Sequence, residues 1–518
     1  MLTSLSKNSG YRLLCSVLWF LVLIGLPLTS FPILSRLTGA IVAPFSAIPL
    51  ALLMLVWLVP FLLERGTFPA EIVPYLYFVL VAVIISGLAF FLNGYYARGR
   101  DFFDQSIRAF VTVAIGLSFY LTFAVYPRDE KTFRQTLLFI YIGGALLIGW
   151  TTLEVFLLRT YVNVRDMPGW FLNFRALLAI QSPNIQFSSR VTGFAYEPSW
   201  FVREFNLVLF PIWLSAVYQR KSIFKFRLWK IQVEDILMLA GLIVFGFSSP
   251  RVGLVAFLAS VAYLGFLFLR GLHRRIMDWY LKRRKQPPKQ LIWVKVVLAA
   301  LMVTIMLVAA GSALVGYVVV ASRWDDRYEL LLEDARMSRL EIFPMTEGRL
   351  VQFARELAFF ERMIYWFGGW NIFNDYPLGV GLGNAGFYFV DRMNGAGFDS
   401  LEMRNLVYRA NYLPNTKNMW TRLLSETGFI GLAVFLVWLY ILWRSAGLIR
   451  KSESKVMKIV GLAGQLFLLA YLVESLSMDS FAMPYQWVMA GLISAGGLFV
   501  RREMKAKDTP QVSESLPA

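Results

Sequence analysis

The sequence contains about twelve apolar runs, each close to the roughly 20 residues that a helix needs to cross a bilayer. They lie near residues 13–30, 40–63, 72–92, 107–126, 135–156, 200–219, 233–248, 252–269, 293–320, 428–443, 457–477 and 485–500. With 58% hydrophobic and 16% charged residues, a 518-residue chain is too apolar for a soluble core. This excludes a soluble enzyme and a disordered or fibrous protein. We therefore expect an all-α, polytopic membrane domain over residues 1–507.

Positive charges indicate the direction in which the chain crosses the membrane. With the N-terminus inside, the inner segments contain 29 Lys and Arg residues and the short outer loops contain 8. We therefore expect both termini in the cytoplasm, and a disordered polar tail over 508–518. The formal charge of +18 then reflects topology and not a nucleic-acid partner. The first apolar run is interpreted as a span and not as a cleaved signal peptide.

Two outer segments, 157–199 and 321–427, are too long to be simple turns, and loops of this length are usually functional. The longer one contains 12 basic and 14 acidic residues, so it is nearly neutral. Apolar residues at helical spacing over 349–366 predict short amphipathic helices in it. A single cysteine, Cys15, and a single histidine, His273, exclude an intramolecular disulfide and any multi-His or Cys-based metal site.

Arginines on the outer side are the first candidates for chemistry, because arginine binds phosphate through a rigid bidentate fork. The candidates are Arg190, Arg203, Arg251 and Arg362. Arg203 falls in the second turn of a predicted span, where an unpaired charge is costly. The structural alternative is an ion pair of Arg203 with Glu197 or Glu204, or a side chain that reaches the membrane interface.

Two carboxylates are candidate general bases. Pro198 suits the first turn of a helix, so Glu197 is expected at a helix N-terminus on the outer membrane surface. Glu426 is expected near the same surface, together with Lys417. Each carboxylate has a structural alternative: Glu197 stabilises the helix end, and Glu426 caps a helix or pairs with Arg422 at helical spacing.

A glycine-rich run over 377–384 allows close backbone approach, but it is weak evidence for phosphate binding. It follows no strand of a βαβ unit, so a nucleotide-binding fold is excluded. Trp366, Trp370 and Trp420 could stack on sugar rings, and an interfacial aromatic belt is an equally good explanation.

Four of these motifs together resemble the O-antigen polymerase and O-antigen ligase superfamily. They are Glu197-Pro198-Ser199, the Ser-Pro-Arg-Val-Gly turn at 249–253, the run at 377–384, and the segment from Asn418 to Gly428. The motifs cover about 190–432, and the twelve-span plan covers nearly the whole chain. Each motif alone is weak, whereas the four in this order form a moderately specific match.

The resemblance implies a glycosyltransferase with a GT-C-like helical fold in the bacterial cytoplasmic (inner) membrane. Its donor and acceptor are undecaprenyl-diphosphate-linked glycans on the outer face, and it needs no cofactor and no metal. Ligases of this family carry a catalytic His-Asn pair, and the matching positions here are Lys417 and Asn418. His273 is expected in a cytoplasmic loop and cannot replace that histidine. A polymerase of O-antigen, capsule or exopolysaccharide is therefore favoured over a ligase.

The roles expected for such a polymerase follow from the residue types. Positive charge on Arg190, Arg203, Arg251 and Arg362 would offset the charge that develops on the leaving diphosphate. Lys417 would join Arg362 on the opposing loop in offsetting that charge, and it counts as a catalytic candidate with the two carboxylates. Glu197, then Glu426, would accept the proton of the acceptor hydroxyl. The residues expected to contact glycan are Trp366, Trp370, Asn418 and Trp420.

Other functions remain open at this point. A lipid-linked-oligosaccharide flippase or another transporter would also have about twelve spans, although no internal halving is visible. A cell-wall glycan polymerase and a purely structural membrane protein fit the motifs and the outer arginines less well. A chain-length regulator and a flippase are the expected protein partners.

Overall fold

The computed structural model describes residues 9–64, 66–93, 95–161, 163–183, 190–227, 229–248, 251–283, 359–393 and 395–508, and scattered positions between 297 and 355. In these residues the protein is almost entirely helical, as the apolar runs predict. The sheet in this part is a short antiparallel hairpin of β1 (Tyr96–Ala97) and β2 (Arg100–Asp101), turned by Arg98 and Gly99 at positive φ.

Seven helices in the described part are long and apolar enough to cross a membrane. They are Ala70–Leu92, Phe102–Val125, Glu130–Tyr161, Pro198–Gln219, Arg251–Tyr280, Met419–Ile449 and Lys455–Glu474. This confirms a multi-pass, all-α membrane protein. The count of twelve spans and the orientation stay predictions, and the run at 293–320 lies largely outside the described residues, as does the tail after 508.

Eight α-helices are described between residues 9 and 178. They are α2 (Ser9–Ile24), α3 (Pro32–Thr38), α4 (Ala47–Leu53), α5 (Val59–Leu63), α6 (Val73–Asn93), α7 (Phe102–Val125), α8 (Glu130–Tyr161) and α9 (Gly169–Leu178). The later ones include α10 (Pro198–Glu204), α11 (Phe210–Gln219), α12 (Val233–Phe247), α13 (Arg251–Arg283), α17 (Phe360–Asp375), α18 (Ala385–Arg392), α19 (Leu401–Tyr408), α20 (Met419–Ile449), α21 (Lys455–Glu474) and α22 (Pro484–Asp508). A π-helical turn, η5 (Phe205–Leu209), joins α10 to α11.

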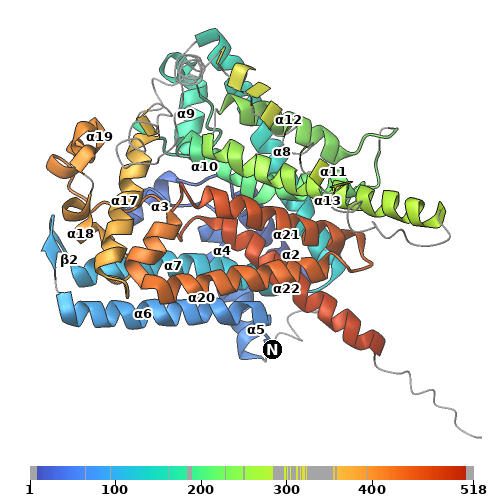
Figure 1. Ribbon diagram of the computed structural model, residues 1–518, viewed down its shortest axis with the longest axis horizontal. Helices are drawn as coiled ribbons and strands as arrows, with labels where there is room; N and C mark the ends of the chain where they lie inside the picture. Colours follow the sequence, from blue (N-terminus) through green and yellow to red (C-terminus); the bar gives the residue numbers. More distant parts are fainter. Residues whose placement is uncertain are drawn as a thin grey trace, which may run out of the picture.

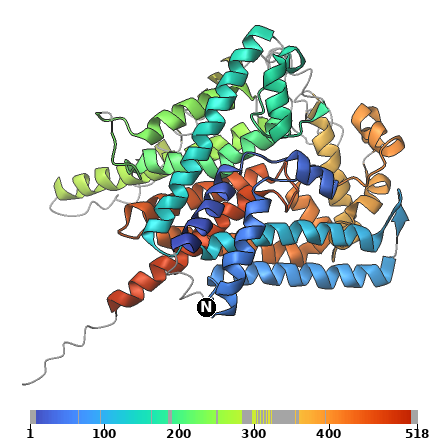
Figure 2. The ribbon, with the colours of Figure 1, turned by 180° about the vertical axis from the view of Figure 1, so that it is seen from behind.

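Helices α6, α7, α20, α21 and α22 form the centre of the bundle and lie side by side (Figure 1). Aromatic side chains fill this centre: Trp438 Nε1 donates to the hydroxyl of Tyr120 at 3.1 Å, and that hydroxyl also lies 3.0 Å from Ser494 Oγ. Figure 2 shows α2 lying against α8 at the back, where Trp19 Nε1 donates to Thr136 Oγ1 at 2.9 Å. The buried polar atoms of these residues therefore satisfy one another in an apolar surrounding.

The described part of the long segment 321–427, from residue 359 on, builds a separate layer at one end of the bundle before it enters α20. Helices α17, α18 and α19 gather there, at the left of Figure 1, beside the β hairpin. They share a small apolar core that includes Ile364, Phe389 and Met403, all buried. α17 confirms the helix expected near residue 366, whereas most of 349–358 lies outside the described residues. This layer covers the N-terminal end of α20 and thereby positions the candidate site.

Candidate functional site at the end of the helix bundle

The start of α10 and the turn before α13 meet at this end of the bundle. Arg190 Nε donates to the carbonyl of Ser248 at 3.0 Å, and Ser248 Oγ donates to the carbonyl of Pro198 at 3.3 Å. α10 begins at Pro198 with Glu197 as its N-cap residue, as the Glu-Pro pair predicts. Arg251 is the first residue of α13 and follows this turn directly. These two contacts therefore hold Arg190 and the start of α10, where Glu197 lies, at Ser248, and Arg251 begins the next helix.

Arg203 lies in the second turn of α10, and its residue surface is 4% exposed. Its Nε is 3.7 Å from Oε2 of Glu474, and its guanidinium also donates to the carbonyl of Ser477. Asn206, in the π-helical turn, donates to Oε1 of Glu474 at 2.6 Å. The structural alternative of an ion pair is therefore confirmed for Arg203, but the partner is Glu474 of α21 and neither Glu197 nor Glu204; Glu204 instead accepts from the Tyr485 hydroxyl.

Arg362, on α17, faces Arg203 and Glu474 from the layer that covers this end of the bundle. These charged residues form the arginine cluster, together with Glu197 and the charged neighbours described below. Burial lowers the pKa of Arg362, and repulsion by the Arg203 charge lowers it further, while Glu197, Glu402 and Glu474 attract it. No carboxylate of the described residues lies within the 4 Å of an ion pair with Arg362. The guanidinium groups of Arg203 and Arg362 are thus both partly desolvated, and they lie close enough for their charges to repel each other.

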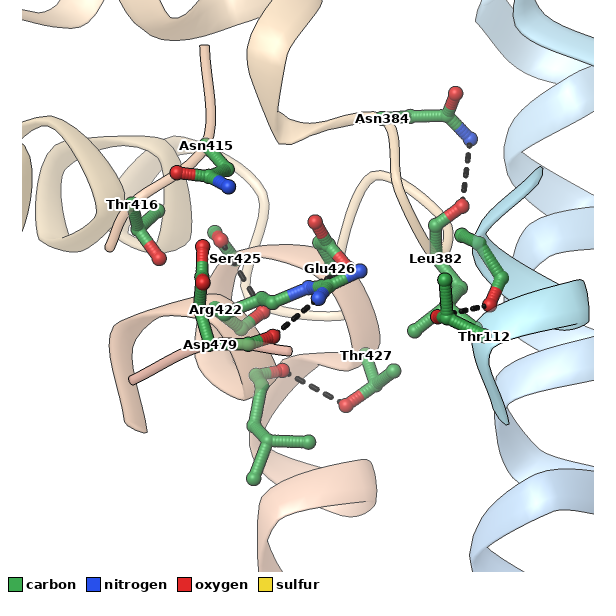
Figure 3. Close-up of polar contacts among 12 residues, drawn as sticks. Thr112, Leu382, Asn384, Asn415, Thr416, Arg422, Ser425, Glu426, Thr427 and Asp479 are labelled. Carbon is green, nitrogen blue, oxygen red and sulfur yellow. Dashed lines mark hydrogen bonds and ion pairs between the residues drawn. The ribbon is translucent and has the colours of Figure 1, made fainter. Parts of the chain in front are cut away.

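Glu426, on α20, is held by a different set of partners from those of Arg203 and Glu474. Arg422 Nε is 3.0 Å from Glu426 Oε2, so the pairing expected from helical spacing is confirmed. The same arginine donates to the backbone carbonyl of Asp479, which Figure 3 shows beside it. The backbone N–H of Gly383 also donates to the Glu426 carboxylate, which is 2% exposed. Glu426 is therefore fully engaged by its own protein neighbours.

The glycine-rich run makes its close approach to α20. Val380 and Gly381 donate their backbone N–H groups to the carbonyls of Ser425 and Glu426, at 2.9 and 3.0 Å. α20 is broken at Gly428, whose φ of 64° and ψ of −171° are not helical. A Cβ atom on Gly379 would lie 2.6 Å from the backbone nitrogen of Gly428. The glycines thus allow two backbones to touch and hold the carboxylate-bearing turn of α20 in place.

Lys417 lies at the edge of the cluster and is not free. Its Nζ is 2.6 Å from Oε1 of Glu402 and 4.3 Å from the centre of the Tyr365 ring. Burial alone would raise the pKa of Glu402, but Lys417, the Tyr365 hydroxyl and Arg362 together hold it below its usual value. Burial and the Glu402 charge raise the pKa of Tyr365.

Three of the four residues expected to contact glycan form hydrogen bonds with the protein backbone. Asn418 is the N-cap of α20, and its Oδ1 accepts from the backbone of Trp420 at 2.8 Å. Trp420 and Trp366 donate their indole N–H groups to the carbonyls of Leu472 and Leu476, both at 3.1 Å. Trp370 is 47% exposed. Trp366 and Trp420 therefore tie α17 and α20 to the end of α21.

Sequence reasoning missed Glu474, Asp479 and Glu402, which complete the cluster. Glu474 is the last residue of an apolar span, and an acidic residue in such a position is a functional candidate by default. The sequence therefore contained a signal for Glu474. Asp479 is the only charged residue in the segment 478–484, and its Oδ2 is buried without a hydrogen bond in the described part of the structure. Glu402 gives no local signal, because only the fold brings it to Lys417.

No set of three or more His, Cys, Asp or Glu residues in the described part is arranged to bind a metal ion. His273 lies on α13 less than one turn beyond Arg270, in the part of that helix far from Arg251. Comparison of the chain with protein-family models and with curated proteins finds no match. The residues of the cluster are therefore the sole indication of function.

Proposed function

We propose that the protein is a membrane glycosyltransferase that joins lipid-diphosphate-linked oligosaccharide repeat units into a surface polysaccharide, on the outer face of a bacterial cytoplasmic membrane. The observation that carries the proposal is that α10 and α17 meet at one turn: Arg203 of α10 donates to the carbonyl of Ser477, and Trp366, four residues after Arg362 on α17, donates to that of Leu476. The charges of Arg203 and Arg362 repel each other, and only Arg203 has a described carboxylate within 4 Å. Two desolvated guanidinium groups in this arrangement favour a ligand with two adjacent negative charges, and a diphosphate is such a ligand.

In the proposed reaction the oxygen of an acceptor sugar hydroxyl attacks the anomeric carbon of the donor. The bond from that carbon to the diphosphate oxygen breaks, and the lipid diphosphate leaves with the electron pair. Arg203 and Arg362 would stabilise this developing charge, with Arg190 and Arg251 at the neighbouring turn.

The proton of the attacking hydroxyl must go to a base, and the contacts favour Glu197 over Glu426. Glu197 is partly exposed and accepts a hydrogen bond from the Ser199 hydroxyl, whereas Glu426 is held by Arg422 and by the Gly383 N–H. A general base must reach the hydroxyl whose proton it takes, and of these two carboxylates only the partly exposed one offers that access. Lys417 would act on the substrate only if its pair with Glu402 opened.

The decisive experiment uses the purified full-length protein in liposomes that contain lipid-diphosphate-linked repeat units. A polymerase converts them into a ladder of longer lipid-linked glycans with no other input, whereas a flippase moves them across the bilayer without lengthening them. A ligase-type transferase lengthens nothing until a separate acceptor lipid is added. Flipping without lengthening, or transfer only to an added acceptor, would overturn the proposal.

A further inference from the structure

A basic cavity of about 630 Å³ lies between α13 and the α20–α21 pair. Four cationic residues line it: Arg270 and Arg274 on α13, and Arg450 and Lys451 just after α20. Within the described residues no Asp or Glu lines the cavity. Four positive charges without an acidic neighbour make this cavity a site for an anion.

The cavity lies at the far end of the bundle from the arginine cluster described above. Between Arg251 and Arg270 the continuous helix α13 rises about 28 Å, because an α-helix rises 1.5 Å per residue. The hydrocarbon core of a bilayer is about 30 Å thick. A helix that starts at one membrane surface with Arg251 therefore brings Arg270 to the other surface, where lipid headgroups lie.

One buried side chain organises the polar wall of the cavity. Gln465 on α21 is 6% exposed, and its Oε1 accepts from the Tyr263 hydroxyl at 3.0 Å and from Arg450 Nη1 at 3.2 Å. This contact uses one of the five donors of the Arg450 guanidinium and holds the group at the cavity. In the described part Arg450 has no carboxylate within 4 Å, so its charge is not neutralised by an ion pair there.

We propose that this cavity binds the phosphate headgroup of an anionic phospholipid. Phosphate is the anion that a cluster of arginines recognises best, and basic pockets between membrane helices bind acidic lipid headgroups. A lipid is favoured over free phosphate because apolar side chains on the same helices continue toward the bilayer centre. Phe266 and Leu267 line the cavity one turn before Arg270 and Gly271, and Phe266 is 46% exposed. Acyl chains can lie against these surfaces. The inference does not depend on the proposed polymerase activity.

The test compares lipid binding by two variants with equal charge loss, Arg270→Gln with Arg450→Gln, and Arg275→Gln with Arg444→Gln. The second pair lies on α13 and in the last two turns of α20, close to the first pair but outside the cavity. Purified full-length protein in phosphatidylcholine nanodiscs is titrated with phosphatidylglycerol, and bound lipid is counted by native mass spectrometry. We expect binding at least tenfold weaker in the cavity pair and nearly unchanged in the control pair.

A third variant tests the cavity without changing its charge. A Cβ on Gly447 would meet only Gln465 Nε2, at 3.6 Å, so Gly447→Leu fills the cavity without a backbone clash. It should also weaken phosphatidylglycerol binding tenfold, at an unchanged melting temperature in phosphatidylcholine. Equal weakening in both charge pairs, full binding by Gly447→Leu, or competition by inorganic phosphate as strong as by the lipid would overturn the proposal.

Discussion

Gly379 and Gly428 pack backbone against backbone at the point where helix α20 breaks. A Cβ on Gly428 would lie 2.4 Å from the carbonyl carbon of Leu378, and one on Gly379 would lie 2.6 Å from the nitrogen of Gly428. Both residues have positive φ, which is 92° at Gly379 and 64° at Gly428. The contact fixes the turn that carries Glu426, two residues before Gly428, and so links the glycine-rich run to the cluster.

Replacing Gly428 by alanine should therefore destabilise the protein. Positive φ on a residue with a Cβ costs about 1–2 kcal/mol, and the clash with Leu378 adds to this. The expected result is a melting temperature several degrees lower in detergent, measured by intrinsic fluorescence. Gly87→Ala on α6 is the control, since a Cβ there meets nothing within 4 Å. Equal melting temperatures for the two variants would contradict this account of the break.

Removal of the Arg362 charge should reduce glycan polymerisation without unfolding the protein. Arg362→Ala is expected to slow chain extension about 100-fold, which is the usual effect of losing one preorganised donor at a developing charge. Arg362→Lys should recover part of the rate, because it restores the charge but not the fork. Arg355→Ala is the control, as Arg355 is exposed and pairs with Asp399 at the protein surface. Normal polymer length in Arg362→Ala, at equal protein level, would remove Arg362 from the site.

Glu197 and Glu426 should respond differently to the same change. Glu197→Gln removes the proposed base and should abolish extension while leaving the melting temperature unchanged. Glu426→Gln leaves the buried guanidinium of Arg422 without its carboxylate, and breaking a buried pair costs about 3–5 kcal/mol. It should therefore lower the melting temperature strongly. The assignment fails if Glu426→Gln is stable and inactive while Glu197→Gln retains activity.

Local sequence patterns predicted the parts of this site that depend on neighbours along the chain. The Glu197-Pro198 pair predicted the start of α10, and the spacing of Arg422 and Glu426 predicted their ion pair. The partners of Arg203 and Lys417 were not predictable, because Glu474 and Glu402 come from other helices and local pairing rules favour nearer residues. The glycine-rich run was expected to allow close backbone approach, and this is confirmed, but its partner, Gly428 of α20, was not predictable for the same reason.

The Glu402–Lys417 pair should make stability depend on pH in the acid range. The pKa of Glu402 is held below its usual value in the folded protein. The pair therefore stabilises the fold fully at pH values above the unfolded-state pKa of about 4.3. This stabilisation is lost as the pH falls through the lower, folded-state pKa. The destabilising effect of Glu402→Gln should thus be present at pH 7 and vanish in strong acid. In a Lys417→Gln background the same substitution should have a smaller effect at pH 7. Melting temperatures of the four proteins across pH 3 to 7 give the answer, and an effect of Glu402→Gln that is independent of both pH and Lys417 would show that the pair does not stabilise the fold.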